Sequence, residues 1–279
     1  MADRFPASAP VRRLNSEPVV MVAAGRALLL QLAHPAVAAG VNDHSDFKTN
    51  PFTRLQGTLE SVNAVVFGTE ALAERVGRRL RWIHSFITGP GYSANDPANL
   101  LWVHATLVDS ALWANETLLG PVDPDVAETY YQQMKQVAEV FGVPLEAQPA
   151  TLADFRRYVD EQVASFELTP VAHDLIGWIL DPTLPLGLHV PLQPVRRRFR
   201  LITLGSLPEL IRAQLDQPWD EDRQRRYERT IRSLRRIFRR LPAPVRTGPL
   251  QLSNPLMLRR ARRTVRAFEQ RQAARSAAA

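Results

Sequence analysis

The chain contains no cysteine. Disulfides, thiolate zinc sites, iron–sulfur clusters and cysteine nucleophiles are therefore excluded, and any metal must be held by nitrogen or oxygen atoms. No apolar run approaches the roughly 18 residues of a membrane-spanning helix, and the first 18 residues lack the apolar core of a signal peptide. These absences predict a soluble, cytoplasmic protein.

Several catalytic motifs are also missing. The sequence has no nucleophile elbow, no Gly-x-Gly-x-x-Gly and no phosphate-binding loop, so hydrolase and dinucleotide-enzyme functions lose support. It has no Glu-x-x-His pair of the kind that builds a carboxylate-bridged di-iron site. His-Glu-x-x-His, the zinc protease signature, is absent as well.

Charge is distributed unevenly along the 279 residues. Residues 196–279 carry 22 arginines against 7 acidic residues, a net charge of +15, whereas residues 1–195 carry a net charge of −8. Only Lys48 and Lys135 among the 35 cations are lysines. The basic character therefore belongs to the last third of the chain.

Hydrophobic residues recur at helical spacing through most of the sequence, and period-two alternation is nearly absent. We therefore predict an all-α fold, a single large helical domain. A loop is expected over 42–51, a proline-rich connector over 182–194, and a proline-containing break before residue 256. The expected helices are 19–33, 52–66, 70–87, 98–119, 124–141, 152–167, 170–180, 195–215, 220–241 and 256–274.

The chain is organised around the stretch 25–58, which begins as an apolar helix of small residues and ends in a polar cluster. Arg54 and Thr58 are four residues apart and therefore share a helical face. Arg54 can donate hydrogen bonds to a carboxylate, a haem propionate or an oxygen intermediate. The alternative is a structural ion pair with Asp96, Asp109 or Asp46. The stretch also contains Arg26, His34 and His44.

Four of the six histidines fall between residues 34 and 104, and His84 and His104 lie on apolar helix faces. A neutral imidazole beside small residues is a common way to present an axial ligand to haem iron. A lone inward histidine is more often a core residue bonded to a backbone carbonyl. A mononuclear metal site formed by His44, Asp46 and another histidine stays open.

The segment 220–241 keeps its apolar residues on one stripe with arginines elsewhere. This pattern is typical of a packed helix with a solvated face, and it also suits attraction to an anionic membrane surface. Nucleic-acid binding is the weaker interpretation because the segment has no recognised reading motif. The stripe consists of Tyr227, Ile231, Leu234 and Phe238.

Three ordered segments resemble the MpaB-like oxygenase family, which includes the rubber oxygenases called latex clearing proteins. They read GRALLLQLAHPAVAAGVNDHSDF…RLQGT, RVGRRLRWIHSFITG and YSANDPANLLWVHATLVDS, and the resemblance covers roughly residues 17–180. It implies an all-helical domain that encloses a pocket for one haem b and uses dioxygen. It also implies oxidative C=C cleavage of a hydrophobic, isoprenoid-like substrate. The alternative is a helical module that binds haem or a lipid without turnover.

The resemblance assigns roles to individual residues. His84 aligns with the axial haem ligand, and Arg54 and Thr58 align with polar residues of the haem-site helix. The cofactor-binding set that we expect also includes Arg26, His34, His104, Thr106 and Asp109. Rubber oxygenases have a lysine where this chain has Gly57, which favours an open or water-occupied sixth iron position and disfavours rubber as the substrate. The expected division of the chain is an N-terminal arm (1–17), an oxygenase-like domain (18–241) and a basic C-terminal extension (242–279).

Overall fold

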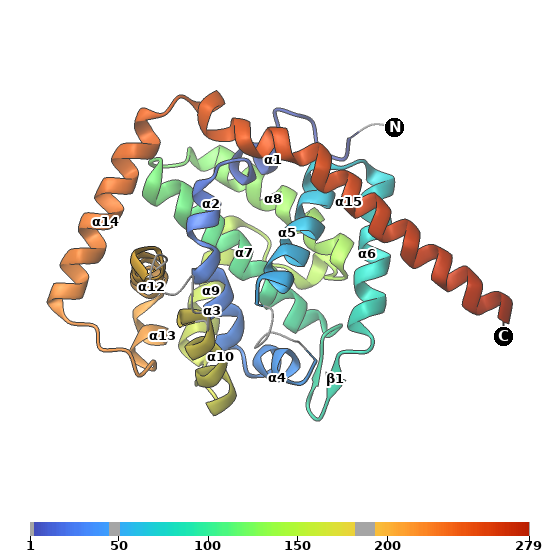
Figure 1. Ribbon diagram of the computed structural model, residues 1–279, viewed down its shortest axis with the longest axis horizontal. Coiled ribbons are helices and arrows are strands. Elements are labelled where there is room, and N and C mark those ends of the chain that lie inside the picture. Colours follow the sequence, from blue (N-terminus) through green and yellow to red (C-terminus); the bar gives the residue numbers. More distant parts are fainter. Residues whose placement is uncertain (1–2, 45–50, 182–192, 279) are drawn as a thin grey trace.

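The fold is all-α, as the helical periodicity predicts (Figure 1). The computed structural model describes residues 3–44, 51–181 and 193–278. A 3₁₀ turn, η2 (Leu145–Ala147), follows α8, and a short antiparallel hairpin pairs β1 (Thr88–Gly89) with β2 (Tyr92–Ser93). The helices are α1 (Pro10–Asn15), α2 (Val19–Val22), α3 (Ala24–Ala33), α4 (Pro35–His44), α5 (Pro51–Phe67), α6 (Glu70–His84), α7 (Pro97–Leu118), α8 (Pro124–Phe141), α9 (Leu152–Ser165), α10 (Pro170–Leu180), α12 (Gln193–Ser206), α13 (Glu209–Ala213), α14 (Glu221–Arg240) and α15 (Ala243–Ala278).

Helix α7 lies at the centre of the fold. It begins after Asp96, whose side chain accepts a hydrogen bond from the N–H of Ala98 at 2.8 Å. Its surface is buried almost all round, which its apolar sequence requires. Helices α2, α3, α8, α9 and α14 all pack against it. The indole Nε1 of Trp102 donates to the carbonyl of Leu30 at 2.9 Å and so joins α7 to α3.

Helix α6 is held against α8 by a close approach at Gly77. A Cβ at this position would lie 2.3 Å from the carbonyl oxygen of Val140, so only glycine lets the two backbones come this near. Arg81, one turn later on α6, donates a hydrogen bond to the same carbonyl. This packing fixes the position of a helix that lines the candidate site.

Residues 3–17 of the expected N-terminal arm pack against the rest of the domain. Val11 is fully buried, and Phe5 and Leu14 are nearly so. The N–H of Val11 donates to the side chain of Gln133 in α8 at 2.9 Å. Val11 and Leu14 are three residues apart and face the core together.

A proline explains one further difference from the expected helices. The expected helix 195–215 is divided into α12 and α13, and Pro208 directly precedes α13. The expected helix 19–33 is also divided, into α2 and α3, at Ala23. Pro35 begins a further helix, α4, after His34, which is extended with ψ of 121°. Proline suits a first helical turn, where its missing N–H removes no hydrogen bond.

The loop expected over 42–51 is wrong at both ends of that range. Helix α4 continues to His44, and Pro51 begins α5. Residues 45–50 lie outside the described residues. The connector expected over 182–194 also lies outside them, except for the last two residues, which begin α12.

The two C-terminal helices cover different sides of the domain (Figure 1). Three residues of the apolar stripe of α14, Ile231, Leu234 and Phe238, pack beside Val19, Ala23, Ala114 and Leu118, as a packed helix with a solvated face predicts. Helix α15 packs along α5 and α6 and continues through Pro249 and Pro255, so the break expected before residue 256 is wrong. Within the described part of the chain, no helix is both long and apolar enough to span a lipid bilayer.

Candidate functional site

A cavity of about 390 Å³ lies among α4, α5, α6, α7 and the hairpin. Its walls are mostly apolar and carry a limited set of polar groups, which is typical of a site for an organic ligand. The polar and titratable lining residues are Gln31, His44, Thr58, Ser61, Arg79, His84, Tyr92, Ser93, Asn99 and His104.

Helix α6 contributes a row of side chains to the cavity. Leu80, Ile83 and His84 line it, and Ile87 continues the row just beyond the helix. Their three- and four-residue spacing places them on one helical face. The sequence therefore predicted correctly that His84 shares a face with apolar residues, and its side chain is half-buried.

The C-terminal end of α6 is tied down by side-chain hydrogen bonds. The amide of Asn95 donates to the carbonyl of Arg81 at 2.9 Å, and the hydroxyl of Ser85 donates to the carbonyl of Trp82 at 2.7 Å. These carbonyls lie in the last turn, where intrahelical donors run out. The bonds therefore stabilise the turn that ends at His84.

His104 enters the cavity wall from α7 and is only 7% exposed. Its Nε2 is buried and accepts or donates no hydrogen bond within the described residues. Burial lowers the pKa of the imidazole to about 4, with the backbone of Met134 acting in the opposite direction. The ring is therefore neutral near pH 7, the state in which imidazole binds iron.

Helix α5 supplies Gly57, Thr58, Ser61 and Val62 to the opposite wall. A Cβ at Gly57 would meet no atom within 4 Å, so space remains beside this residue. Arg54 lies one turn earlier on the same helix, but its side chain lies outside the described atoms. The predicted role of Arg54 therefore stays a prediction.

The hairpin and α4 form one end of the cavity. Nε2 of the exposed His44 lies 3.0 Å from the carbonyl oxygen of Thr88. The hydroxyl of Tyr92 donates to Asp43 at 2.7 Å. This hydrogen bond raises the pKa of Tyr92 to about 12 and lowers the pKa of Asp43. Both contacts fasten the hairpin to α4.

Arg79 is a lining residue that the sequence analysis missed. It lies on α6, one turn before Ile83, and is partly buried. Burial lowers the pKa of its guanidinium, and the nearby Glu60 acts in the opposite direction. The described residues form no hydrogen bond or ion pair with Arg79. Its four-residue spacing from Ile83 was visible in the sequence, but the helix carries three other arginines, and nothing in the sequence distinguished Arg79 from them.

Arg26 and Asp109 lie together, away from the cavity lining. Nη2 of Arg26 contacts a carboxylate oxygen of Asp109 at 2.5 Å, and Nη1 donates to the carbonyl of Ser206 at 2.6 Å. The guanidinium also lies 5.9 Å from the ring centre of Trp113. This arrangement joins α3, α7 and α12.

Thr106 and His34 also lie outside the cavity lining. The hydroxyl of the buried Thr106 donates to the carbonyl of Val103 in its own helix at 2.7 Å. The ring of His34 packs edge-on against Phe166, with 5.2 Å between ring centres, and burial lowers its pKa. The cavity thus brings together Thr58, His84 and His104 from the predicted set.

The described residues contain no group of three or more histidine, aspartate or glutamate side chains able to hold a metal ion. Asp46 lies outside them, so the mononuclear site with His44 is not tested. Haem needs only one protein ligand for its iron, because the macrocycle supplies the others. A single histidine is therefore enough for that cofactor.

The fold and site define a class of protein, a helical domain whose apolar cavity presents histidines from three helices, α4, α6 and α7. Comparison with known proteins makes this specific. Residues 11–236 match the family described as "ER-bound oxygenase mpaB/B'/Rubber oxygenase, catalytic domain". The chain belongs to this family of oxygenase domains, as its motifs indicated.

Two curated relatives are an uncharacterized protein of Mycobacterium bovis and one of Mycobacterium tuberculosis. Each is 29% identical over 226 residues, which cover 77% of this chain and 87% of the relative. No solved structure matches the chain significantly. The comparisons therefore support an oxygenase at the level of the family.

Proposed function

We propose that this protein is a haem b-dependent oxygenase that acts on a hydrophobic, alkene-containing substrate of isoprenoid type. The observation that carries the proposal is the pair His84 and His104 in the wall of one mostly apolar cavity. Membership of the oxygenase family supports the reaction class.

The lining residues fit the chemistry of haem. His104 is neutral and has a buried nitrogen without a hydrogen-bond partner among the described residues. Apolar side chains from α4, α6 and α7 suit the faces of a flat macrocycle, and nothing lies within 4 Å of a Cβ placed at Gly57. His84 is the residue that we assign as the iron ligand, with His104 as a second imidazole facing the same space.

The protein residues then have separate tasks. Bound haem supplies the capacity to activate dioxygen. His84, at the firmly bonded end of α6, holds and orients the cofactor, and the apolar walls bind the alkene and exclude water. Thr58 provides a hydroxyl on the opposite wall, and we assign Arg54 to the same side as a donor.

The overall reaction that we propose needs no external reductant. Both atoms of one dioxygen molecule are added across a C=C bond, the bond is broken, and two carbonyl products form. Atoms and electrons balance because dioxygen is the sole oxidant. The apolar character of the cavity suits a substrate without charged groups near the reacting bond.

The test is a visible absorption spectrum of protein expressed with a haem supply, recorded before and after dithionite and carbon monoxide. We expect a Soret band that shifts on both treatments. His84→Ala should lose haem or change this spectrum, whereas His173→Ala, at a histidine outside the cavity lining, should retain it. A colourless wild-type protein that takes up no added haem would refute the proposal.

Oxygen consumption distinguishes catalysis from simple binding. Haem-loaded protein should consume dioxygen when supplied with isoprenoid alkenes and should yield carbonyl products. A protein that holds haem but consumes no dioxygen with any such substrate would support the alternative, a helical haem- or lipid-binding module.

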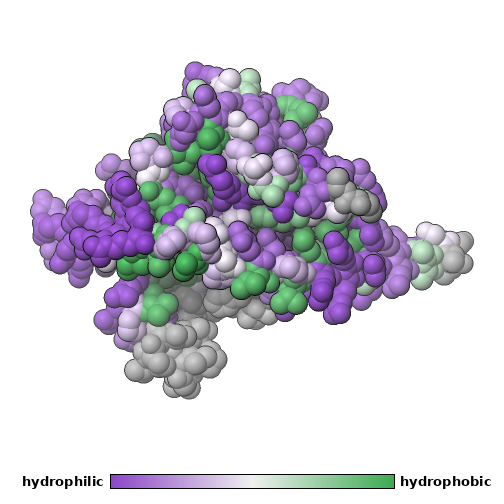
Figure 2. All heavy atoms as spheres, turned by 90° about the horizontal axis from the view of Figure 1, so that it is seen from above, coloured by the Kyte–Doolittle hydropathy of each residue, from purple (hydrophilic) through white to green (hydrophobic). Residues whose placement is uncertain are grey.

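We also propose peripheral binding to anionic membranes through the turn between α14 and α15. Ile237, Leu241 and Val245 are 53%, 38% and 59% exposed there, among exposed arginines of α14. Figure 2 shows apolar patches among strongly hydrophilic side chains on the face seen from above. Arginines attract anionic headgroups, and the apolar side chains insert between them.

Vesicle sedimentation tests this second proposal. Phosphatidylserine-containing vesicles should bind the full chain in a salt-dependent manner, and phosphatidylcholine vesicles should not. The double variant Ile237→Ser, Val245→Ser should reduce binding. Equal binding to both kinds of vesicle would contradict the proposal.

A further inference from the structure

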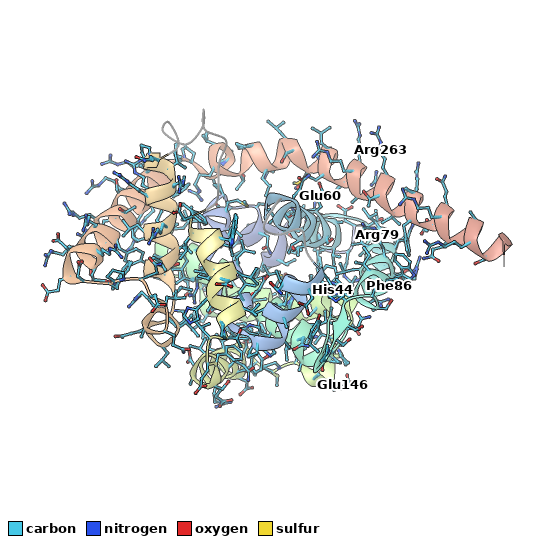
Figure 3. All side chains as sticks on the ribbon, turned by 60° about the horizontal axis from the view of Figure 1, so that its bottom comes forward. His44, Glu60, Arg79, Phe86, Glu146 and Arg263 are labelled. Atoms are coloured by element: carbon cyan, nitrogen blue, oxygen red, sulfur yellow. The ribbon has the colours of Figure 1, made fainter. Side chains whose placement is uncertain are left out.

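Arg79 occupies an unusual position for a cation. It lines the cavity of His84 and also a second cavity of about 360 Å³ between α6 and α15. Figure 3 shows Arg79 close to helix α15, on the side of the molecule where His44 and Glu60 also lie. The guanidinium therefore stands in the wall between the candidate cofactor site and the basic C-terminal helix.

The surroundings of Arg79 leave its charge without a direct partner among the described residues. The negative charge of Glu60 raises the pKa of Arg79. Glu60 itself accepts a hydrogen bond from Gln56 at 2.8 Å and lies 4.0 Å from Arg260. Other arginines of α6 have clear partners. Arg75, for example, forms two hydrogen bonds of 2.8 and 2.6 Å with Glu269.

The second cavity adds more positive charge and no carboxylate. Arg271 and Arg275 of α15 line it together with Arg79, and Trp82 and Phe268 form its apolar part. A partly buried guanidinium with two further cations beside it is a site for an anion, best matched by a planar carboxylate.

We propose that Arg79 binds a carboxylate of the haem held in the adjoining cavity, and that Arg271 and Arg275 strengthen this site from α15. This inference rests on the proposed function. It gives α15 a role in cofactor binding, although α15 begins after residue 236, where the family match ends. Haem b carries two propionate groups, so an apolar cavity needs positively charged residues at its edge to bind them.

Haem titration of the full-length apoprotein, followed at the Soret band, tests the assignment. Arg79→Met should weaken haem binding roughly tenfold, the effect of one charge-assisted hydrogen bond at a partly exposed site. Arg78→Met is the matched control, because Arg78 directly precedes Arg79 on α6, is 57% exposed and faces Glu74. Arg79→Lys should recover part of the loss, and Arg271→Met should lose less than Arg79→Met.

Haem dimethyl ester, whose carboxylates are blocked, separates charge from shape. The wild-type protein should bind the ester more weakly than haem, and Arg79→Met should not weaken ester binding further. Equal haem affinities of Arg79→Met and Arg78→Met would overturn the assignment while leaving haem binding intact. Equal weakening of haem and ester binding would overturn it too.

The outcomes remain distinguishable from those of the proposed function. A wild-type protein that binds neither haem nor its ester refutes the haem proposal and this assignment together. Circular dichroism shows whether each variant is folded. Should Arg79→Met not fold, the wild-type comparison carries the test, and equal affinity for haem and ester overturns the assignment.

Discussion

Asp109→Asn tests whether the ion pair with Arg26 supports the fold or the cofactor. The side chain of Asp109 is 23% exposed and that of Arg26 is 8% exposed. Substitution of Asp109 therefore leaves an almost buried guanidinium without its counter-ion. Breaking such a pair costs about 3–5 kcal/mol when burial is complete. Asp109 is partly exposed, and asparagine keeps an acceptor for the guanidinium. We therefore expect a loss of about 2–3 kcal/mol.

The assay is urea unfolding of the cofactor-free protein, together with a thermal scan. A loss of that size lowers Tm by about 3–5 °C for a chain of this length. Glu116→Gln is the matched control on the same helix. Glu116 pairs with Arg156 at 2.9 Å, but these side chains are 37% and 55% exposed, so its loss should stay below about 1 kcal/mol.

Haem affinity decides between the two roles. Asp109 lies outside the cavity lining, so Asp109→Asn should bind haem as tightly as the wild type at temperatures where both are folded. A variant with wild-type stability and weakened haem binding would refute this reasoning. It would restore the role that the sequence suggested for Asp109 and Arg26.

Other substitutions test the packing and the titration of the site. Gly77→Ala should destabilise the protein by about 1–3 kcal/mol because its Cβ would meet the Val140 carbonyl. Gly177→Ala, where nothing lies within 4 Å, should stabilise it by up to about 1 kcal/mol in the same urea assay. The lowered pKa of His104 contributes stability above pH 6.5 that is lost as the pH falls towards about 4. The loss in cofactor-free protein should be about 2–4 kcal/mol. His104→Gln should flatten this pH dependence, and an unchanged slope in this variant would contradict the assignment.

Local signals predicted most of the helices because their causes are local. The ranges 124–141 and 170–180 agree with α8 and α10, since each begins with an N-cap and a proline and has a clear apolar face. The packing of the N-terminal segment could not be predicted, for the opposite reason. Its burial depends on Val11 meeting α8, a contact between segments that no local pattern reveals.

The candidate site was predictable to a similar extent. His84 and His104 were found because inward-facing histidines interrupt apolar faces at helical spacing. Arg26 and Asp109 were placed in the cofactor site because they lie in family-like motifs. A motif does not tell which of its residues face a cavity and which join helices. Only the tertiary structure separates these two uses of a polar residue.

The arginines of α6 show why charge near the site could not be assigned from the sequence. Within seven residues, Arg75 pairs with an acid almost two hundred positions later, and Arg78 faces one a turn earlier. Arg81 donates to a carbonyl of α8, whereas Arg79 faces the cavity. All four have the same chemistry, so their roles are set by which helix lies opposite each one. The C-terminal helix α15 neutralises Arg75 through Glu269 and brings further cations beside Arg79. The edge of the apolar cavity at Arg79 is therefore positively charged.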